Sequence, residues 1–519
     1  MNSRKNGALL SYLTVVANIL SNIILVPFYI RYIGLNEYGL YQYVFSIAQY
    51  ALIMDFGISS IMIKYITRYR LQNDKQKEAN FAAYGILIVA ISITFILIIC
   101  TVLRLNFTSI IHNRTDQELK LAFRLFNLMI IQMILPIIQH YFDGVMLGYE
   151  KYTIAKALSF GRIIVKTGLI VLNVVFGMGI EGIAIGDIIA TAICILISCV
   201  FVFSKIRFKI KWHYYDKVVF KESFILVFAI MLQSIVTYIN NAINKYMLGS
   251  MLDNAAVAIF SLAISISTVF IDIPIAIHPI LLPQATTLVE KNSDGETLTD
   301  FVIKVGRLQC VLCLGMLCGF ALVGRQFILL WSGNETIIAW SIALILMIAS
   351  ALPLIQSACL TILTAKNKRS FRSYILMIVA LFNLGFSYFL IKDFGVIGAS
   401  IGSSIAFILG NCIIMNIYYK KAIGLNVSRM LSSVFSRIWV CAAAASILTL
   451  PVVLLIPSVF LSFVFGVIIF CIIYIVALML YGFNTYEKTL VKNIVRKVIR
   501  DCRFFTTYLI SSAKRIIGK

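Results

Sequence analysis

Fourteen long apolar blocks, separated by short polar stretches, run through the whole chain. A membrane-spanning helix needs about 20 consecutive apolar residues, so each block is long enough to cross a bilayer. Of the 519 residues, 61% are apolar and 13% are charged, whereas soluble proteins have about 45–50% and about 25%. The sequence therefore predicts an all-α integral membrane protein with no room for a separate soluble catalytic domain.

The blocks predict fourteen transmembrane helices, and their even number places both termini on one side of the membrane. The predicted spans are 8–31, 40–66, 81–103, 121–141, 152–176, 180–204, 222–249, 254–282, 301–325, 337–363, 371–391, 395–419, 432–456 and 459–483. If both termini are cytoplasmic, the inner segments carry 35 Lys and Arg residues and the outer loops carry 8. Because basic residues favour the cytoplasmic side, this bias supports both the helix count and the orientation.

The net charge of +23 is spread over many short loops and does not form a nucleic-acid-binding face. The first block has no signal-peptide cleavage site, so we expect it to be a retained helix. Cys310 and Cys313 have no second pair or histidine cluster nearby, so we predict no metal and no cofactor. The tail 484–519 alternates basic and apolar residues, which predicts an amphipathic helix on anionic phospholipids.

An internal duplication becomes visible when the chain is shifted against itself by 216 positions. The repeated residues are Gly179, Gly182, Ile185, Gly186, Ile189 and Ala190, which match Gly395, Gly398, Ile401, Gly402, Ile405 and Ala406. Because the repeat spans six helices, both copies have the same orientation. We predict two pseudo-symmetric six-helix lobes, 1–204 and 221–420, joined by a basic linker 205–220 and followed by two further helices in 421–483. Such lobes favour a transporter that works by alternating access.

Polar residues at bilayer depth mark the candidate site, because an ionisable side chain there is costly and by default faces a cavity or a partner. The fifth helix carries Arg162 and Lys166 in a stripe with Ser159 and Asn173. The seventh and first helices add the candidates Gln233, Asn240, Asn244, Lys245, Asn22 and Arg31. The deep acids are Asp55, Asp187 and Asp272.

Each of these groups has a structural explanation beside the functional one. The charges can form interhelical ion pairs, such as Asp187 or Asp55 with Arg162 or Lys166, and the amides can hydrogen-bond between helices. In the functional interpretation, a cationic cleft lined by amides suits an anionic substrate with many hydroxyl groups. Arg and Lys bind phosphate, and Asn and Gln offer donors and acceptors to sugars.

At four places the chain resembles the multidrug/oligosaccharidyl-lipid/polysaccharide exporter superfamily, and within it the bacterial O-antigen and capsule repeat-unit flippases. The similar segments are 32–39 (YIGLNEYG), 55–58 (DFGI), 148–152 (GYEKY) and 240–245 (NNAINK). The resemblance implies a flippase of the cell inner membrane that moves an undecaprenyl-diphosphate-linked oligosaccharide between leaflets before a separate polymerase acts. The chain departs from the family at Asn244, where an acid commonly precedes the basic residue, so Lys245 lacks its usual neighbouring counter-ion.

These observations lead to a set of predicted roles. Arg162 and Lys166 are predicted to hold the diphosphate, while Lys245 and Arg31 attract the cargo near the outer mouth. Asp55, Asp187 and Asp272 are candidates for coupling to a proton or sodium gradient. Two alternatives remain, namely a multidrug or cation antiporter of the same superfamily and a membrane-embedded glycan polymerase or ligase. The second is disfavoured because the outer loops are short and the four histidines form no cluster.

Overall fold

The computed structural model describes residues 2–54, 57–111, 114–214, 221–223, 240, 242–275, 278–291, 294–366, 368, 370–489 and 491–493. Within these ranges the regular structure is helical throughout, without strands. Eleven of the described helices are long and apolar enough to cross a bilayer. The prediction of an all-α, multi-pass membrane protein is therefore confirmed.

The chain divides into two compact units. The first unit holds α1 (Asn2–Tyr32), α2 (Leu35–Ala48), η1 (Gln49–Met54), α3 (Ile58–Leu71), α4 (Lys75–Leu105), α5 (Phe107–Ile110), α6 (Asp116–Gly148), α7 (Tyr152–Val175), α8 (Glu181–Phe201) and η2 (Val202–Ile206). It also holds α10 (Asn254–Ile275), α11 (His278–Glu290), η3 (Asn334–Thr336), α13 (Ile338–Ile355), α14 (Ser357–Ala365), α15 (Ser370–Phe407), η4 (Ile408–Ile414) and α16 (Met415–Ile423).

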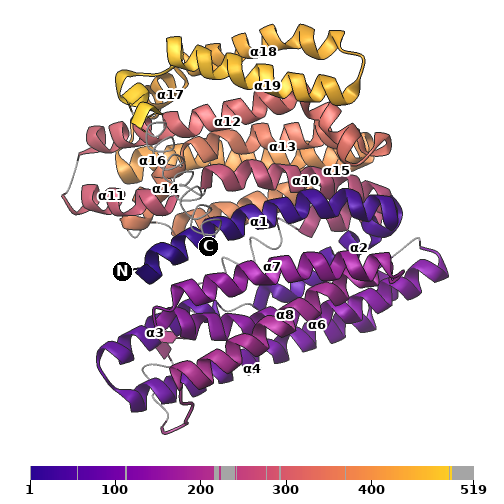
Figure 1. Ribbon diagram of the computed structural model, residues 1–519, viewed down its shortest axis with the longest axis vertical. Helices are drawn as coiled ribbons and strands as arrows, with labels where there is room; N and C mark the ends of the chain where they lie inside the picture. The colour runs from indigo at the N-terminus through magenta and orange to yellow at the C-terminus, as the bar shows by residue number, and fades with distance from the viewer. Residues whose placement is uncertain are drawn as a thin grey trace, which may run out of the picture. The chain divides into compact units, whose positions relative to one another are not determined.

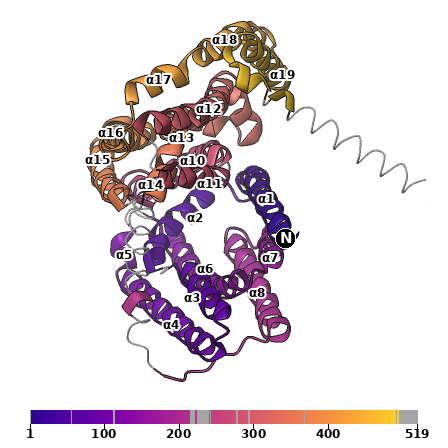
Figure 2. The same cartoon turned by 90° about the vertical axis from the view of Figure 1, so that its left-hand side faces the viewer.

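In the first unit, α1 packs along α7, and α7 packs along α8, which also contacts α6 (Figure 1). The helices α3 and α4 complete this group through contacts with α6, as Figure 2 shows. Downstream, α10 packs against α2 and α13, and α13 packs against α15. The helices α1 and α7 are also joined by a hydrogen bond between the hydroxyls of Ser21 and Thr167, which are 2.6 Å apart.

Small residues on α8 let it approach α7 closely. A Cβ atom added to Gly182 would lie 2.9 Å from Asn173 Cβ, and one added to Gly186 would lie 2.8 Å from a side-chain carbon of Ile170. Such four-residue spacing of small side chains is common where membrane helices pack tightly. The close approach places Asp187, the next residue on α8, beside the polar stripe of α7.

The internal duplication has a counterpart in the backbone. Gly179 and Gly395 occupy matching positions of the repeat, and both have a left-handed φ, +53° and +57° respectively. This conformation strains residues that carry a side chain, so glycine is needed at both turns. At the second site, Gly402 lies so close to Ser387 that an added Cβ would be 2.6 Å from the Ser387 nitrogen. The two matched segments therefore share a glycine with positive φ and a close helix contact.

Three predicted spans are divided among the described residues. The block 337–363 is divided between α13 and α14 at Gln356, and the block 432–456 between α17 (Val427–Phe435) and α18 (Ile438–Leu455) at residues 436–437. The block 40–66 is not one helix, because η1 ends at Met54 and α3 begins at Ile58 after Gly57, which has a φ of +59°. The block 254–282 contains α10, which has Pro274 inside it, and the start of α11, while residues 276 and 277 between them lie outside the described residues.

The second unit contains α12 (Gly295–Trp331), α17 (Val427–Phe435), α18 (Ile438–Leu455), α19 (Val459–Ala477) and η5 (Leu478–Gly482). The helices α18 and α19 form an antiparallel pair, seen in yellow in Figure 1. Arg307 on α12 forms an ion pair with Glu487 at 2.7 Å, and both side chains are almost fully buried. Arg307 also donates hydrogen bonds to the carbonyl oxygens of Ser433, Ser436 and Gly482. Of the predicted amphipathic tail, residues 490 and 494–519 lie outside the described residues.

Candidate functional site

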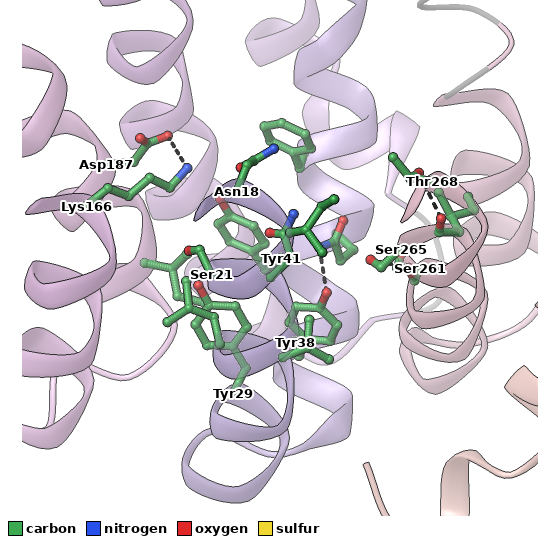
Figure 3. A pocket seen from close by; sticks show the side chains of 18 of the residues that line it. Asn18, Ser21, Tyr29, Tyr38, Tyr41, Lys166, Asp187, Ser261, Ser265 and Thr268 are labelled. Carbon is green, nitrogen blue, oxygen red and sulfur yellow. Dashed lines mark hydrogen bonds and ion pairs between the residues drawn. The ribbon is translucent and has the colours of Figure 1, made fainter. Parts of the chain in front are cut away.

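A cavity of about 360 Å³ lies within the first unit. Its lining comes from α1, α2, α6, α7, α8, α10 and the helical segment 242–251. Figure 3 shows the ion pair of Lys166 and Asp187 on one side, hydroxyl side chains of α10 on the other, and tyrosines between them. The cavity therefore has walls of different chemistry.

The charged wall is built by α7 and α8. Lys166 Nζ lies 3.1 Å from Asp187 Oδ2, and Arg162 Nη1 lies 3.8 Å from Asp187 Oδ1. Gln132 on α6 donates a 2.7 Å hydrogen bond to the same carboxylate, and Arg162 donates one of 3.2 Å to the Thr191 hydroxyl. The Asp187 side chain is 12% exposed, whereas those of Arg162 and Lys166 are 35% and 34% exposed. One acid is therefore shared by two cations that still reach the cavity.

Lys245 adds a third cation to the lining. Its ammonium group donates a 2.9 Å hydrogen bond to Gln42 Oε1, and Gln42 in turn donates one of 3.0 Å to the Tyr38 hydroxyl. Within the described ranges, Lys245 forms no ion pair. The acid on the α10 wall, Asp272, likewise forms none with a described residue, and it is half-buried. Among the described residues, the lining thus holds three cations and two acids, so this part of the wall has a net positive charge.

The structure brings six of the predicted site residues to this one cavity. They are Asn22, Arg162, Lys166, Asp187, Lys245 and Asp272. The interhelical ion pair that the sequence offered as an alternative, between Asp187 and the two α7 cations, is present as well. Ion pairing and exposure to a cavity therefore occur together at these residues.

The other predicted residues lie elsewhere. Asn244 is buried and donates a 2.9 Å hydrogen bond to the Ser403 hydroxyl, and Asn240 donates to the Leu376 carbonyl at 3.4 Å. Arg31 lies exposed in the last turn of α1 and is not part of the lining. Gln233 and Asp55 lie outside the described residues.

Several lining residues were missed at the sequence level. They are Gln132, Gln42, the tyrosines Tyr29, Tyr38 and Tyr41, and the α10 hydroxyls Ser261, Ser265 and Thr268. A signal for the hydroxyls was present, because with Asp272 they recur at spacings of four, three and four residues, which is one helix face. The tyrosines carry no such signal, since aromatic residues also fill apolar cores.

The family comparison matches the polysaccharide biosynthesis protein family over residues 3–280, more than half of the chain. The chain belongs to this family. The described residues that line the cavity all fall within the matched range. A related protein of Shigella flexneri, provisionally assigned as an O-antigen transporter, is 22% identical over 398 residues, which cover 76% of this chain and 92% of that protein.

Solved structures with the same fold are transporters. The lipid II flippase MurJ, in an inward closed conformation, matches with a TM-score of 0.69 and 14% identity, over 93% of this chain and 99% of that one. An inward-facing multidrug resistance transporter of the MATE family matches with a TM-score of 0.64 and 14% identity, over 79% of this chain and 94% of that one. At these identities the likeness establishes the fold, which is that of the MurJ and MATE transporters.

Proposed function

We propose that this member of the polysaccharide biosynthesis protein family is a flippase for undecaprenyl-diphosphate-linked oligosaccharide repeat units. It moves them across the cell inner membrane by alternating access, for the synthesis of O-antigen or capsule, and a separate polymerase then receives them. The observation that carries this proposal is the cavity with Arg162, Lys166 and Lys245 in its lining and, among the described residues, the two acids Asp187 and Asp272 beside them. Family membership and the transporter fold support it.

The charged wall suits a diphosphate. Arginine binds phosphate oxygens through a planar fork of donors, and lysine acts as a compact positive charge. Because Asp187 lies against both α7 cations, an incoming diphosphate competes with this carboxylate for them. The site is therefore suited to exchange, in which the cations are paired with Asp187 when the cavity is empty and with the cargo when it is loaded. The prenyl chain stays in the lipid, and no covalent chemistry is needed.

The arrangement in the membrane is part of the proposal. We infer fourteen transmembrane helices, two six-helix lobes in 1–204 and 221–420, and both termini in the cytoplasm. The distribution of Lys and Arg supports this orientation, and the matched geometry at Gly179 and Gly395 supports the repeat. The helix Phe371–Ile423, with a non-helical backbone at Gly395, then counts as two spans.

The remaining roles stay proposals of the same kind. Arg31, at the end of α1, and Lys245 attract the anionic cargo near the outer mouth. Asn22, Asn240, Asn244 and Gln233 offer amides to the glycan. Coupling to a proton or sodium gradient is assigned to Asp55, Asp187 and Asp272, of which Asp187 and Asp272 line the cavity. The basic tail 484–519 binds anionic phospholipids.

A second candidate function is export of organic cations, as in a multidrug antiporter. The observation that favours it is Asp272, a cavity acid that forms no ion pair with a described residue. An antiporter of this kind would need an acid as the binding group and would tolerate loss of the α7 cations. The transport activity of variants that lack Arg162 and Lys166 therefore distinguishes the two functions.

The test is replacement of Arg162 and Lys166 by alanine in the native host, with surface glycan and the leaflet distribution of the lipid-linked unit as readouts. The proposal predicts loss of surface glycan and accumulation of the unit in the inner leaflet. The matched control is Arg124→Ala, because Arg124 is an exposed arginine that forms an ion pair with Glu181 at 3.1 Å and is not part of the cavity lining. Normal glycan export at a normal protein level would refute the proposal and favour the antiporter, which tolerates loss of both cations.

A further inference from the structure

A row of hydroxyl groups forms the α10 wall of the cavity. Ser261, Ser265 and Thr268 all line it, and their spacing of four and three residues places them on one face of the helix. Figure 3 shows the three side chains together, on the side of the cavity away from Lys166 and Asp187. The row is therefore separate from the charged wall that the proposed diphosphate site occupies.

Ser261 is the unusual member of the row. The residue is buried, at 2% exposure, and its hydroxyl oxygen has no hydrogen-bond partner among the described residues. Buried polar groups in proteins are nearly always hydrogen-bonded, because an unpaired one loses its contact with water without compensation. An unpaired buried hydroxyl in a cavity wall is explained if a ligand supplies the missing partner.

The other two hydroxyls complement Ser261. Ser265 donates to the Ser261 carbonyl and Thr268 donates to the Ile264 carbonyl, both at 2.9 Å. Their protons are thus used within the helix, and their lone pairs remain as acceptors. The row offers a free donor at Ser261 and acceptors at Ser265 and Thr268, which matches the hydroxyl groups of a sugar because each of them both donates and accepts.

The tyrosines supply a second uncharged surface beside the hydroxyl row. Tyr29 and Tyr38 stack with ring centroids 5.6 Å apart, and Tyr38 is held by the hydrogen bond from Gln42. Tyr41 stacks on Phe45 at 6.0 Å. A tyrosine has an apolar ring with a polar tip, and a sugar ring alternates apolar C–H faces with hydroxyl edges. The tyrosines and the α10 row therefore present neutral groups of the kind that bind sugars.

We propose that the α10 hydroxyl row and the tyrosines Tyr29, Tyr38 and Tyr41 form a sugar subsite, in which Ser261 and Thr268 determine specificity for the glycan. This inference rests on the proposed function, and it adds that the cargo is held at two places. The diphosphate lies on the α7 and α8 wall, and the uncharged sugar rings lie against α10 and the tyrosines. The subsite distinguishes a glycosylated diphosphate lipid from the bare one.

The test compares two probes with the purified full-length protein in nanodiscs. One probe is undecaprenyl diphosphate, and the other is the same lipid carrying the oligosaccharide, extracted from the native host. The variant Ser261→Ala/Thr268→Val removes two hydroxyls with little change of shape. A lost neutral hydrogen bond weakens binding by about 3- to 10-fold, so with two hydroxyls removed we expect the glycosylated probe to bind about 10- to 100-fold more weakly. The affinity for the bare probe should change less than about twofold.

Three further variants make the result specific. Thr268→Ser, which keeps the hydroxyl, is expected to retain wild-type affinity for the glycosylated probe. Thr94→Val is the matched control, because Thr94 makes the same helix-internal hydrogen bond to Ala90 at 2.9 Å but is exposed on α4. Lys166→Gln is expected to weaken the binding of both probes by the same factor, since both carry the diphosphate. Melting temperatures of all variants show that each is folded.

Two outcomes would overturn the sugar subsite alone. In the first, wild-type protein binds the bare and the glycosylated probes equally well. In the second, the Ser261→Ala/Thr268→Val variant lowers the binding affinity for both probes by the same factor, or leaves both affinities unchanged. Wild-type protein that binds neither diphosphate lipid would instead contradict the proposed function, and the subsite with it. A failure of the sugar subsite can therefore be distinguished from a failure of the proposed function.

Discussion

Lys166 Nζ lies 3.1 Å from Asp187 Oδ2, across the contact between α7 and α8 and in the wall of the cavity. The carboxylate is buried, while a third of the lysine side chain remains exposed. Removing one member of a buried pair normally leaves a costly unpaired charge. Here the cation faces a polar cavity, so loss of Asp187 is expected to affect binding more than folding.

This relationship predicts that Asp187→Asn strengthens the binding of undecaprenyl diphosphate. The amide removes a negative charge that competes with the cargo for Lys166 and Arg162, and we expect a gain in affinity of up to about tenfold. Turnover should fall because the cargo leaves more slowly. Both are measured on reconstituted protein, by equilibrium binding and by translocation rate. Asp300→Asn is the control, since Asp300 forms an exposed pair with Arg429; weaker binding by the Asp187 variant would contradict the exchange described above.

The contact between α7 and α8 predicts that Gly186→Ala is destabilising. The added Cβ would lie 2.8 Å from Ile170, and overpacking of this kind costs about 1–3 kcal/mol. Gly402→Ala should behave alike at the matching position of the repeat, where Ser387 is the neighbour. The apparent melting temperature of the purified protein checks both.

Gly168→Ala is the matched control for these glycine variants. Gly168 also lies in a transmembrane helix, but an added Cβ would meet nothing within 4 Å. Alanine is favoured over glycine inside a helix by about 1 kcal/mol, so this variant should melt at the same or a higher temperature. Equal melting temperatures for Gly168→Ala and Gly186→Ala would show that close packing on α8 does not limit stability.

In the second unit, the buried pair of Arg307 and Glu487 predicts a large loss of stability for Glu487→Gln. Glu487 accepts two hydrogen bonds from Arg307, at 2.7 and 3.0 Å, and one from the Asn484 amide at 2.8 Å. Breaking a buried pair leaves an uncompensated charge and costs about 3–5 kcal/mol. The loss is measured as a drop in the apparent melting temperature.

The control for this pair is Arg429→Gln. Arg429 and Asp300 form an ion pair of similar length, 2.8 Å, but their side chains are 44% and 61% exposed. Exposed pairs contribute about 0–1 kcal/mol, so this variant should melt close to the wild-type temperature. A Glu487→Gln variant as stable as Arg429→Gln would mean that the buried pair does not hold the second unit together.

The sequence predicts the membrane helices well because hydropathy and length suffice to define them. It does not predict the break before Ile58, because hydropathy carries no information about the left-handed backbone of Gly57.

The charged half of the site follows from the sequence, and the neutral half does not. Arg162, Lys166 and Asp187 stand out because charge is rare at bilayer depth. Hydroxyl and aromatic side chains such as Thr268 and Tyr38 are common in membrane helices, so their role becomes visible only when the cavity is seen. Asn244 precedes Lys245 and therefore points about 100° away from it around the helix, which is why only the lysine reaches the cavity.

The measurement that tests the central claim most directly is the translocation of the host's lipid-linked oligosaccharide in proteoliposomes by the double variant Arg162→Gln/Lys166→Gln. The matched double variant Arg124→Gln/Lys77→Gln breaks two ion pairs that lie outside the cavity lining. If the two cavity cations meet the diphosphate, the cavity variant is at least about tenfold slower, because each lost charged hydrogen bond costs about 1.5–3 kcal/mol. The control keeps the wild-type rate. A cavity variant that translocates as fast as the control, at equal reconstituted amounts, would contradict the account.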